Sequence, residues 1–308
     1  MSIYRHALPQ LSEGITLTDG GIETTLIYHD GIELPSFAAF VLLDDDAGRA
    51  TLIRYFASYL SLAREAGLPL VLESPTWRAN PDWGAALGDD AGALDRVNQG
   101  AIGFLREIAE DWGDRISDIR VVGMVGPRGD GYAAGSASNA DEAAEYHAAQ
   151  VVSFAAAGAD EVEGLTMTDT YEALGVARAA EAAGVPAVLS FTVETDGRLP
   201  DGTALGDAVS TIDRDTPPAY FMVNCAHPQH VLPALEGAGP WVDRVRGVRS
   251  NASTQSHAEL DEAESLDEGD LGVLVPAHRE LEKHLPALEI VGGCCGTDAR
   301  HVAALWGV

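Results

Sequence analysis

The segment that decides the fold reads "NADEAAEYHAAQVVSFAAAGADEVEGLTMTDTYEALGVARAAEAAGVPAVLSFTVE" (139–194). Its first helical pattern opens with Asn139, and Glu142 three residues later gives a capping-box pattern. Each of its two helical patterns leads directly into a short apolar stretch that is typical of a buried strand. Helices that alternate with strands predict a parallel sheet. The helical patterns cover 139–158 and 169–184, and the strands cover 159–168 and 185–194.

The same alternation extends along the rest of the chain. A further helical pattern covers 49–67, and six further strands are predicted at 14–21, 68–76, 119–127, 219–228, 243–251 and 287–296. Eight such units in 308 residues predict one (β/α)8 barrel domain that spans residues 1–308. A doubly wound open sheet is the alternative, but it would more often show fewer strands and a dinucleotide-binding fingerprint.

The composition is that of a globular protein with a strongly acidic surface. The chain is 46% hydrophobic, which is enough for a sizeable core, and its net charge is −29. This charge repels nucleic acid and anionic membranes, so neither is expected as a partner. The acidity suits a salty cytoplasm, but a GC-rich genome would also replace Lys with Arg. It indicates no particular oligomeric state.

Neither a signal peptide nor a membrane span is expected from the sequence. The N-terminal segment "MSIYRHALPQLSEG" (1–14) has no apolar stretch of signal-peptide length. No uncharged apolar run approaches the roughly 20 residues that a membrane span needs. We therefore expect a cytoplasmic protein.

All three cysteines fall where predicted strands end. Cys225 follows the sixth strand, and Cys294 and Cys295 follow the eighth. The active site of a (β/α)8 barrel lies at these carboxyl ends, and closure of the barrel brings the sixth and eighth strands near each other. Adjacent cysteines do not readily form a disulfide, because the geometry is strained. The three thiols are therefore candidates for one shared site, although a buried cysteine can also act as a small hydrophobic residue.

Three convergent thiolates predict a zinc site with one open position. Zinc favours tetrahedral sulfur coordination, and three protein ligands leave the fourth place to a substrate. Gly292 and Gly293 before the cysteine pair, with Gly296 after it, allow the backbone turns that aim consecutive side chains into one pocket. Zinc with three thiolates is a poor Lewis acid for water but a good host for another thiol. The expected chemistry is alkylation of a substrate thiol.

The motifs "GGCCGT" (292–297), "NC" (224–225) and "DGG" (19–21) resemble the zinc-dependent homocysteine S-methyltransferase family. This family includes betaine-, S-methylmethionine- and cobalamin-dependent enzymes. The resemblance runs nearly end to end and implies a (β/α)8 barrel whose zinc is held by Cys225, Cys294 and Cys295. It also implies a small-molecule thiol acceptor, homocysteine, that is methylated to methionine.

Substrate contacts are expected from other strand ends. Asp19, Gly20 and Asn224 would orient the substrate or the ligands, and Glu73 and Trp77 would face the methyl donor. An aromatic face with nearby carboxylates suits a small sulfonium or quaternary ammonium compound. No catalytic residue beyond the zinc site is expected, and no organic cofactor is needed.

The sequence departs from the family pattern in the fourth and seventh strands. Leu165 stands where the family usually has the Glu that contacts the amino group of homocysteine, and Glu163 is expected to point to the other face or to another depth of its strand. "RSNAST" (249–254) replaces a Tyr-Pro-Asn that is common after the seventh strand. These differences leave open a methyltransferase for a different thiol acceptor.

Two further alternatives remain open at this point. His227 and His230 have metal-like spacing beside Cys225 and could form a hydrolytic zinc site. The barrel could also be a non-catalytic zinc- or thiol-binding protein that serves as a sensor or an interaction partner.

Overall fold

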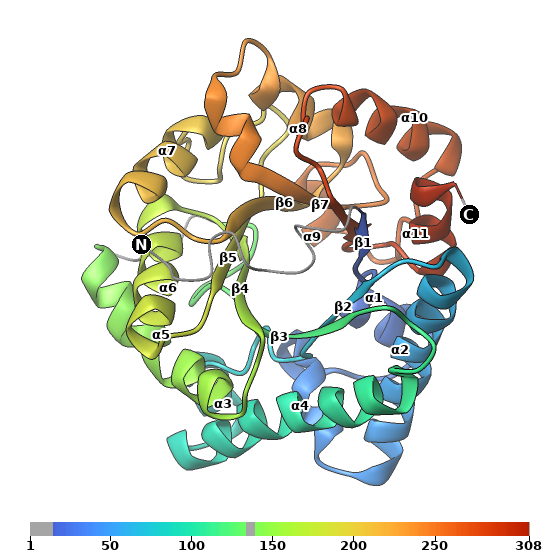
Figure 1. The fold of residues 1–308 in the computed structure, drawn as a ribbon, viewed down its shortest axis with the longest axis vertical. Coiled ribbons are helices and arrows are strands. Elements are labelled where there is room, and N and C mark those ends of the chain that lie inside the picture. Colours follow the sequence, from blue (N-terminus) through green and yellow to red (C-terminus); the bar gives the residue numbers. More distant parts are fainter. Residues whose placement is uncertain (1–14, 134–138, 308) are drawn as a thin grey trace.

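The computed structural model describes residues 15–133 and 139–307, so the N-terminal segment 1–14 lies outside the described residues. Eight parallel strands pair in chain order, and pairing of β1 with β8 closes the barrel (Figure 1). The predicted (β/α)8 fold is confirmed, and closure excludes the open sheet. The strands are β1 (Thr16–Leu17), β2 (Leu70–Glu73), β3 (Ile119–Val125), β4 (Glu161–Met167), β5 (Ala187–Phe191), β6 (Tyr220–Ala226), β7 (Val245–Ser250) and β8 (Ile290–Gly293).

Helices surround the barrel (Figure 1). The Asn139 side chain accepts a hydrogen bond from the Glu142 amide, so the predicted cap starts this helix. The long helices are α2 (Asp46–Ala66), α4 (Ala91–Trp112), α5 (Ala140–Ala156), α6 (Thr170–Ala183), α7 (Leu205–Asp215) and α10 (Leu271–Glu282). The shorter ones are α1 (Ile22–Thr24), η2 (Thr25–His29), η3 (Pro35–Phe37), η4 (Ala39–Leu43), α3 (Pro81–Leu87), α8 (Pro228–Leu235), η5 (Pro240–Arg244), α9 (His257–Asp261) and α11 (Ala299–Trp306).

Residues of β5 and β6 contribute to two separate apolar clusters. On β6, Phe221 and Val223 pack with the main cluster between strands and helices, whereas Tyr220 and Met222 belong to a smaller cluster inside the barrel. This alternation follows from the two-residue period of a strand. The inner cluster also contains Val188 and Ile290, and the Tyr220 hydroxyl donates to the buried Glu161 at 3.4 Å.

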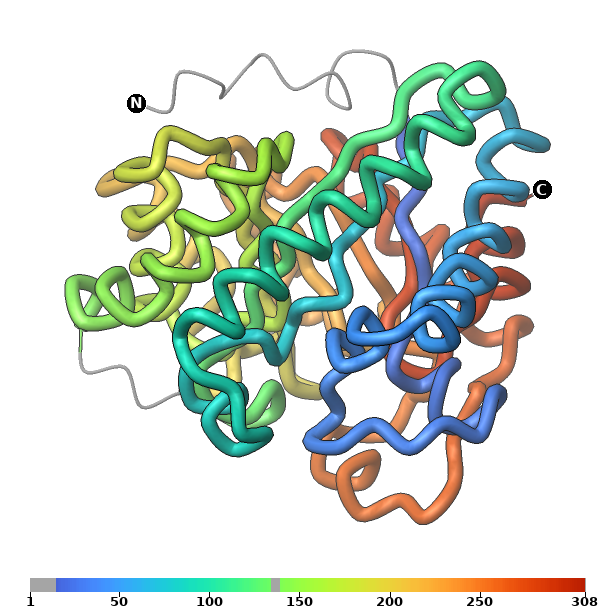
Figure 2. The backbone as a smooth tube through the Cα atoms, turned by 90° about the horizontal axis from the view of Figure 1, so that it is seen from below, coloured from blue at the N-terminus to red at the C-terminus, as the bar shows by residue number. Residues whose placement is uncertain are grey.

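Two segments extend the barrel wall at the carboxyl ends of the strands. In Figure 2, the blue segment after β1 and the orange segment after β7 lie side by side at one end of the molecule. Tyr28 and Phe37 from the first segment and Leu260 and Ala263 from the second line one common hollow. Within the described residues, no helix has both the length and the apolarity that a membrane crossing requires.

Candidate active site

The structure brings the three predicted thiols together. The sulfur atoms of Cys225, Cys294 and Cys295 all lie within 4.8 Å of one another. The Sγ atoms of Cys225 and Cys295 are 3.5 Å apart. Cys225 lies near the end of β6, and the other two follow β8 directly. The 69-residue separation in sequence is removed because β6 and β8 are next-nearest neighbours in the closed barrel.

Unusual backbone conformations aim these side chains at one point. Cys225 has φ of 56°, in the left-handed region that costs a non-glycine residue energy, of order 1–3 kcal/mol. After the cysteine pair, Gly296 turns the chain with φ of 76°. Gly293 is required for a different reason, because a Cβ there would collide with the Thr297 side chain. The two glycines next to the cysteine pair therefore have different roles. Gly296 adopts a positive φ, and Gly293 allows the close approach of Thr297.

Asn224 is positioned by a network on neighbouring strands. Its Oδ1 accepts hydrogen bonds from the Thr166 amide at 2.9 Å and from the Ser190 hydroxyl at 2.7 Å. Its Nδ2 donates to the Thr166 hydroxyl at 2.7 Å and lies 3.8 Å from Cys294 Sγ. Thr166 has φ of 61°, which is an outlier for a β-branched residue. Asn224 therefore holds a strained turn on β4 against the cysteine cluster.

Tyr132 and His257 also contact the cluster, and sequence reasoning missed both. The Tyr132 hydroxyl lies 3.5 Å from the Sγ atoms of Cys225 and Cys295, and its ring stacks on His257 at 4.3 Å between centroids. His257 Nε2 lies 2.8 Å from the Cys225 carbonyl oxygen, while its Nδ1 lies 3.1 Å from Glu194. The only signal in the sequence was an aromatic residue in the long glycine-rich loop after the third strand.

Crowding of the thiols changes their proton affinities in opposite directions. The Cys225 thiol donates a hydrogen bond to Cys294, and this bond lowers the pKa of Cys294 well below its usual range. The same bond raises the pKa of Cys225, because Cys225 must keep its proton to donate it. The Arg249 guanidinium also favours the thiolate of Cys294. The cluster therefore offers a soft, electron-rich set of sulfur donors, and this set fits a zinc ion.

A buried arginine that was not predicted supports the floor of the site. Arg249 on β7 forms ion pairs with Asp19 and Glu73 and donates to the Gly293 carbonyl oxygen at 3.0 Å. Asp19 also accepts from the Tyr55 hydroxyl at 3.0 Å. Burial raises the pKa of Asp19 to about 6, although Arg249 and Tyr55 oppose this shift. Glu73 thus supports Arg249 and does not line the cavity that opens above the cysteines, so its expected contact with the donor is not seen.

A cavity of about 350 Å³ opens above the cysteines, and we call it the mouth cavity. Trp77 is expected to offer its ring to the cationic donor, but a cation of the protein already packs on this ring. The Arg78 guanidinium lies between the rings of Trp77, at 4.2 Å, and Trp83, at 3.9 Å. One face of Trp77 is therefore already occupied by a cation. The cavity is lined by Gly20, Gly21, Ile22, Glu23, Thr24, Ser36, Phe37, Trp77, Arg78, Trp83, Met124, Asp130, Gly131, Tyr132, Leu165, Thr166, Cys225, Arg249, Asp261, Cys294 and Cys295.

The two residues in question on β4 lie at different depths of the same face. Leu165 is buried and lines the mouth cavity, so this position offers no charge to a substrate. Glu163 lies two residues deeper in the barrel, beside Glu161, and does not reach the cavity lining. Burial, followed by the charge of Glu161, raises the pKa of Glu163 to about 8. Of the two positions expected for Glu163, the other face of the strand or another depth, the structure supports another depth.

Residues 16–307 match the sequence family described as Homocysteine S-methyltransferase. The chain belongs to this family. Its fold is shared with homocysteine methyltransferase MmuM from Escherichia coli. The metallated form has a TM-score of 0.73 at 22% identity, and the oxidized form has 0.74 at 23%. Each comparison covers 96% of both chains. No curated protein sequence matches the chain.

Family membership makes the protein a methyltransferase, and the hydrolytic alternative finds no support. His227 caps α8, because its Nδ1 accepts from the Gln229 amide at 3.2 Å. His230 Nε2 lies 3.1 Å from the Thr254 carbonyl oxygen. Among the residues that the structure describes, neither histidine belongs to a group able to hold a metal with the thiols.

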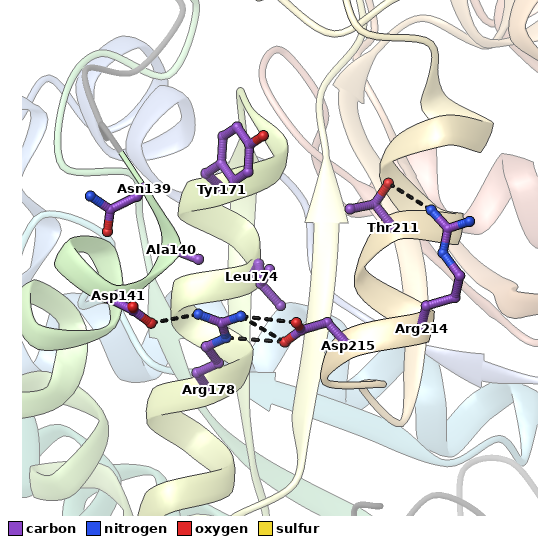
Figure 3. Close-up of a pocket in the computed structure, with 9 residues that line it drawn as sticks. All are labelled: Asn139, Ala140, Asp141, Tyr171, Leu174, Arg178, Thr211, Arg214 and Asp215. Carbon is purple, nitrogen blue, oxygen red and sulfur yellow. Dashed lines mark hydrogen bonds and ion pairs between the residues drawn. The ribbon is translucent and has the colours of Figure 1, made fainter.

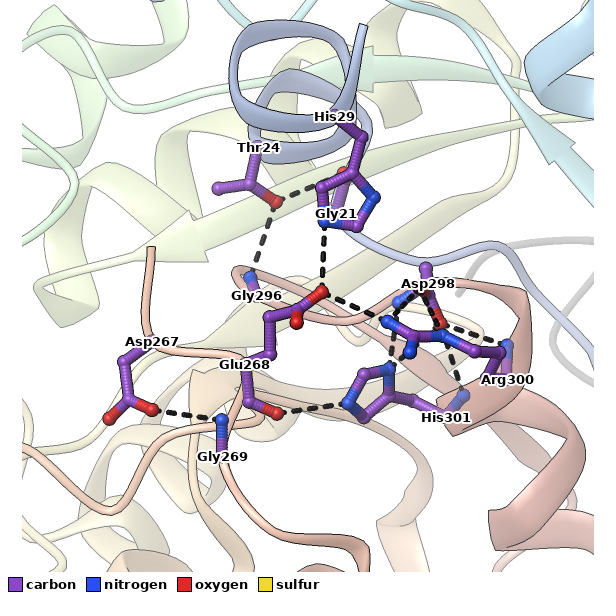
Figure 4. Close-up of polar contacts among 10 residues, drawn as sticks. All are labelled: Gly21, Thr24, His29, Asp267, Glu268, Gly269, Gly296, Asp298, Arg300 and His301. Carbon is purple, nitrogen blue, oxygen red and sulfur yellow. Dashed lines mark hydrogen bonds and ion pairs between the residues drawn. The ribbon is translucent and has the colours of Figure 1, made fainter. Parts of the chain in front are cut away.

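A second group of potential metal ligands lies beside the methyltransferase site. His29, Glu268 and Asp298 approach one another at the surface (Figure 4). Glu268 already pairs with His29 and Arg300, each at 2.9 Å, and Asp298 pairs with His301 at 2.9 Å. These contacts tie the segments after β1, β7 and β8 together, which is a structural role.

A larger hollow lies on the outer surface of the methyltransferase, away from the thiols. Its volume is about 470 Å³, and it lies between α5, α6 and α7 (Figure 3). Arg178 crosses this hollow, donating to Asp141 at 2.6 Å and to Asp215 at 2.9 Å. The guanidinium is thereby held between two carboxylates, and we assign the chemistry to the smaller mouth cavity, where the thiols lie.

Proposed function

We propose that Cys225, Cys294 and Cys295 hold one zinc ion and that the protein transfers a methyl group from a small onium donor to homocysteine. The donor would be a sulfonium or a quaternary ammonium compound. The observation that carries this proposal is the convergence of three sulfur atoms within 4.8 Å at a cavity of substrate size. Family membership independently supports the reaction class.

Zinc, when bound, would keep a substrate thiol in its thiolate form at neutral pH. In the transfer, the acceptor sulfur forms a bond to the methyl carbon while the bond from that carbon to the donor heteroatom breaks. The electron pair of the broken bond stays on the donor, which loses its positive charge, and the proton of the acceptor thiol is released to solvent. Methionine and a neutral donor product result.

The residues of the chain position the reactants and supply negative charge. Asn224 orients Cys294 through its amide, and Gly20 lines the acceptor side of the cavity. Asp19 pairs with Arg249 below the cavity and so holds the guanidinium that supports the segment of the cysteine pair. Trp77 forms part of the wall, and Asp130 and Asp261 add negative charge that favours a cationic donor. Loss of the donor charge during transfer would weaken these contacts and assist release of the product.

Metal analysis of the purified, reduced protein tests the ligand assignment. We expect about one zinc per chain, because three thiolates bind zinc strongly and leave the fourth position to the substrate. Cys225→Ala, Cys294→Ala and Cys295→Ala should each lose most of it. His227→Ala and His230→Ala serve as matched controls and should retain it. Full retention in all three cysteine variants would overturn the assignment.

Turnover tests the reaction itself. Zinc-loaded protein is incubated with homocysteine and a panel of sulfonium and quaternary ammonium donors, and methionine is measured by mass spectrometry. Formation of methionine with one or more donors is expected. If the metal-bound protein methylates no thiol with any donor, the non-catalytic zinc-binding alternative replaces this proposal.

A further inference from the structure

Glu23 lines the mouth cavity and has no direct cationic partner among the described residues. It lies in the short helix α1, directly after the Gly20–Gly21 pair, and its side chain is half-buried. Among the described residues, it makes no close ion pair and no side-chain hydrogen bond with another residue; its own amide group approaches it, and the charges of Arg249 and Arg78 act on it from a longer distance. Burial raises the pKa of Glu23 to about 7. A partly desolvated carboxylate of this kind favours a cation beside it.

The position of Glu23 relative to the thiols is fixed by the backbone. The Gly296 amide donates to the Thr24 hydroxyl at 3.2 Å (Figure 4). The Gly21 amide donates to the Thr297 carbonyl oxygen at 3.1 Å. Gly21 also packs so closely on the Cys294 carbonyl that a Cβ would collide with it. Glu23 therefore stays in register with the cysteine pair, and Cys294 is among the charges that raise its pKa.

The other carboxylates of the region are less suited to an enclosed cation. Both oxygens of Asp19 are engaged, one by Arg249 and the other by Tyr55. Asp130 and Asp261 line the cavity but are exposed to solvent, where an ion pair is weak. Glu23 is thus the partly buried carboxylate of the mouth cavity that has no direct ion pair among the described residues and can accept a substrate cation.

An amino-acid thiol brings the cation that this carboxylate needs. In homocysteine the ammonium nitrogen is four bonds from the sulfur, so a sulfur at the cysteines places the ammonium on the nearby cavity wall. The wall at Leu165 is apolar and offers no counter-charge. An ammonium group left unpaired there would oppose binding, because burial of an isolated charge is costly.

We propose that Glu23 is the specificity-determining residue for the acceptor and pairs with the ammonium group of an amino-acid thiol. This inference rests on the proposed function, because it places the acceptor sulfur at the three cysteines. A positively charged donor would also be attracted to Glu23. The fixed register between α1 and the cysteine pair favours the acceptor.

The test compares homocysteine with 4-mercaptobutanoate, which is the same thiol without the ammonium group. Binding of each to the zinc-loaded protein is measured by titration calorimetry, and KM values for acceptor and donor are measured where turnover occurs. Glu23→Gln should weaken homocysteine binding by about 10- to 100-fold, the range for a charged hydrogen bond, and leave 4-mercaptobutanoate unchanged. Leu165→Glu added to Glu23→Gln should recover part of the preference.

Glu33→Gln is the matched control, because it removes a charge from an exposed site in the same segment. It should leave the ratio of the two affinities unchanged. Equal weakening of both thiols by Glu23→Gln, a change confined to the donor KM, or no preference for homocysteine in the wild type would each overturn the inference. Preferential homocysteine binding without methyl transfer to any thiol would refute the proposed function and leave the role of Glu23 intact.

Discussion

Asn224 connects the strained turn on β4 to the cysteine cluster. Asn224→Ala leaves the buried Thr166 amide and Ser190 hydroxyl without their acceptor, so we expect a loss of about 1–3 kcal/mol in the free energy of unfolding. Because Cys294 also loses its amide neighbour, zinc affinity should fall. Urea unfolding and competition with a chelator measure the two effects.

Asn98→Ala is the control for this prediction. Asn98 is equally buried, and its amide donates to the Ala79 and Leu94 carbonyl oxygens. Its loss should lower the free energy of unfolding by a similar amount without changing zinc affinity. A parallel fall of zinc affinity in both variants would show that Asn224 acts only through global stability.

His278 predicts a specific dependence of stability on pH. It is buried in α10, and this burial, with the charge of Arg279, lowers its pKa to about 4. The unfolded chain has a histidine pKa of about 6.5, so between these values the unfolded state binds the proton and the folded state does not. Stability should therefore fall as the pH drops from about 6.5 to 4.

A substitution isolates this contribution. His278→Leu should reduce the slope of unfolding free energy against pH in that window by about 1.4 kcal/mol per pH unit, the value for one proton. Chemical unfolding at a series of pH values measures the slope. Nε2 of His278 lies 3.6 Å from Glu282, and this carboxylate favours the protonated histidine in the folded state. An unchanged slope would mean that this contact keeps the folded-state proton.

At the scale of elements, the contact between α5 and α6 depends on a helical glycine. A Cβ at Gly175 in α6 would collide with Ala143 of α5. Gly175→Ala should therefore destabilise the protein by about 1–3 kcal/mol through overpacking, although alanine is the better helix former.

Gly103 in α4 gives the opposite expectation. It is exposed, and a Cβ there meets no atom within 4 Å. Gly103→Ala should raise the free energy of unfolding by about 0.5–1 kcal/mol, because only helix propensity changes. Thermal unfolding of the two variants tests the pair. The same sign of change in both would show that close helix packing does not decide the effect at Gly175.

At the scale of the whole molecule, the net charge of −29 predicts stabilisation by salt. Like charges repel one another across the folded surface more strongly than in the expanded chain. Since the screening length falls from about 10 Å at 0.1 M to about 3 Å at 1 M salt, the melting temperature should rise over this range. NaCl and KCl should act equally. A constant or falling melting temperature would mean that surface ion pairs outweigh the repulsion.

The sequence by itself determined the eight strands, the barrel and the placement of all three cysteines. These features depend on local periodicity and on the general rule that strand ends share one face of a barrel. Leu165 and Glu163 could be placed on one strand, but not at a depth, because depth depends on how that strand is staggered against its neighbours.

Only the tertiary structure decided the partners inside the site. Arg249 is drawn between Asp19 and Glu73 because closure of the barrel brings β1, β2 and β7 around one desolvated volume. Within the described part of the chain, Glu23 lines the mouth cavity without a direct ion pair, whereas Glu73 pairs with Arg249 below the cavity. A sequence shows which charges a chain carries. Which of them neutralise one another depends on distances that closure of the barrel creates, since a buried charge must find its partner there.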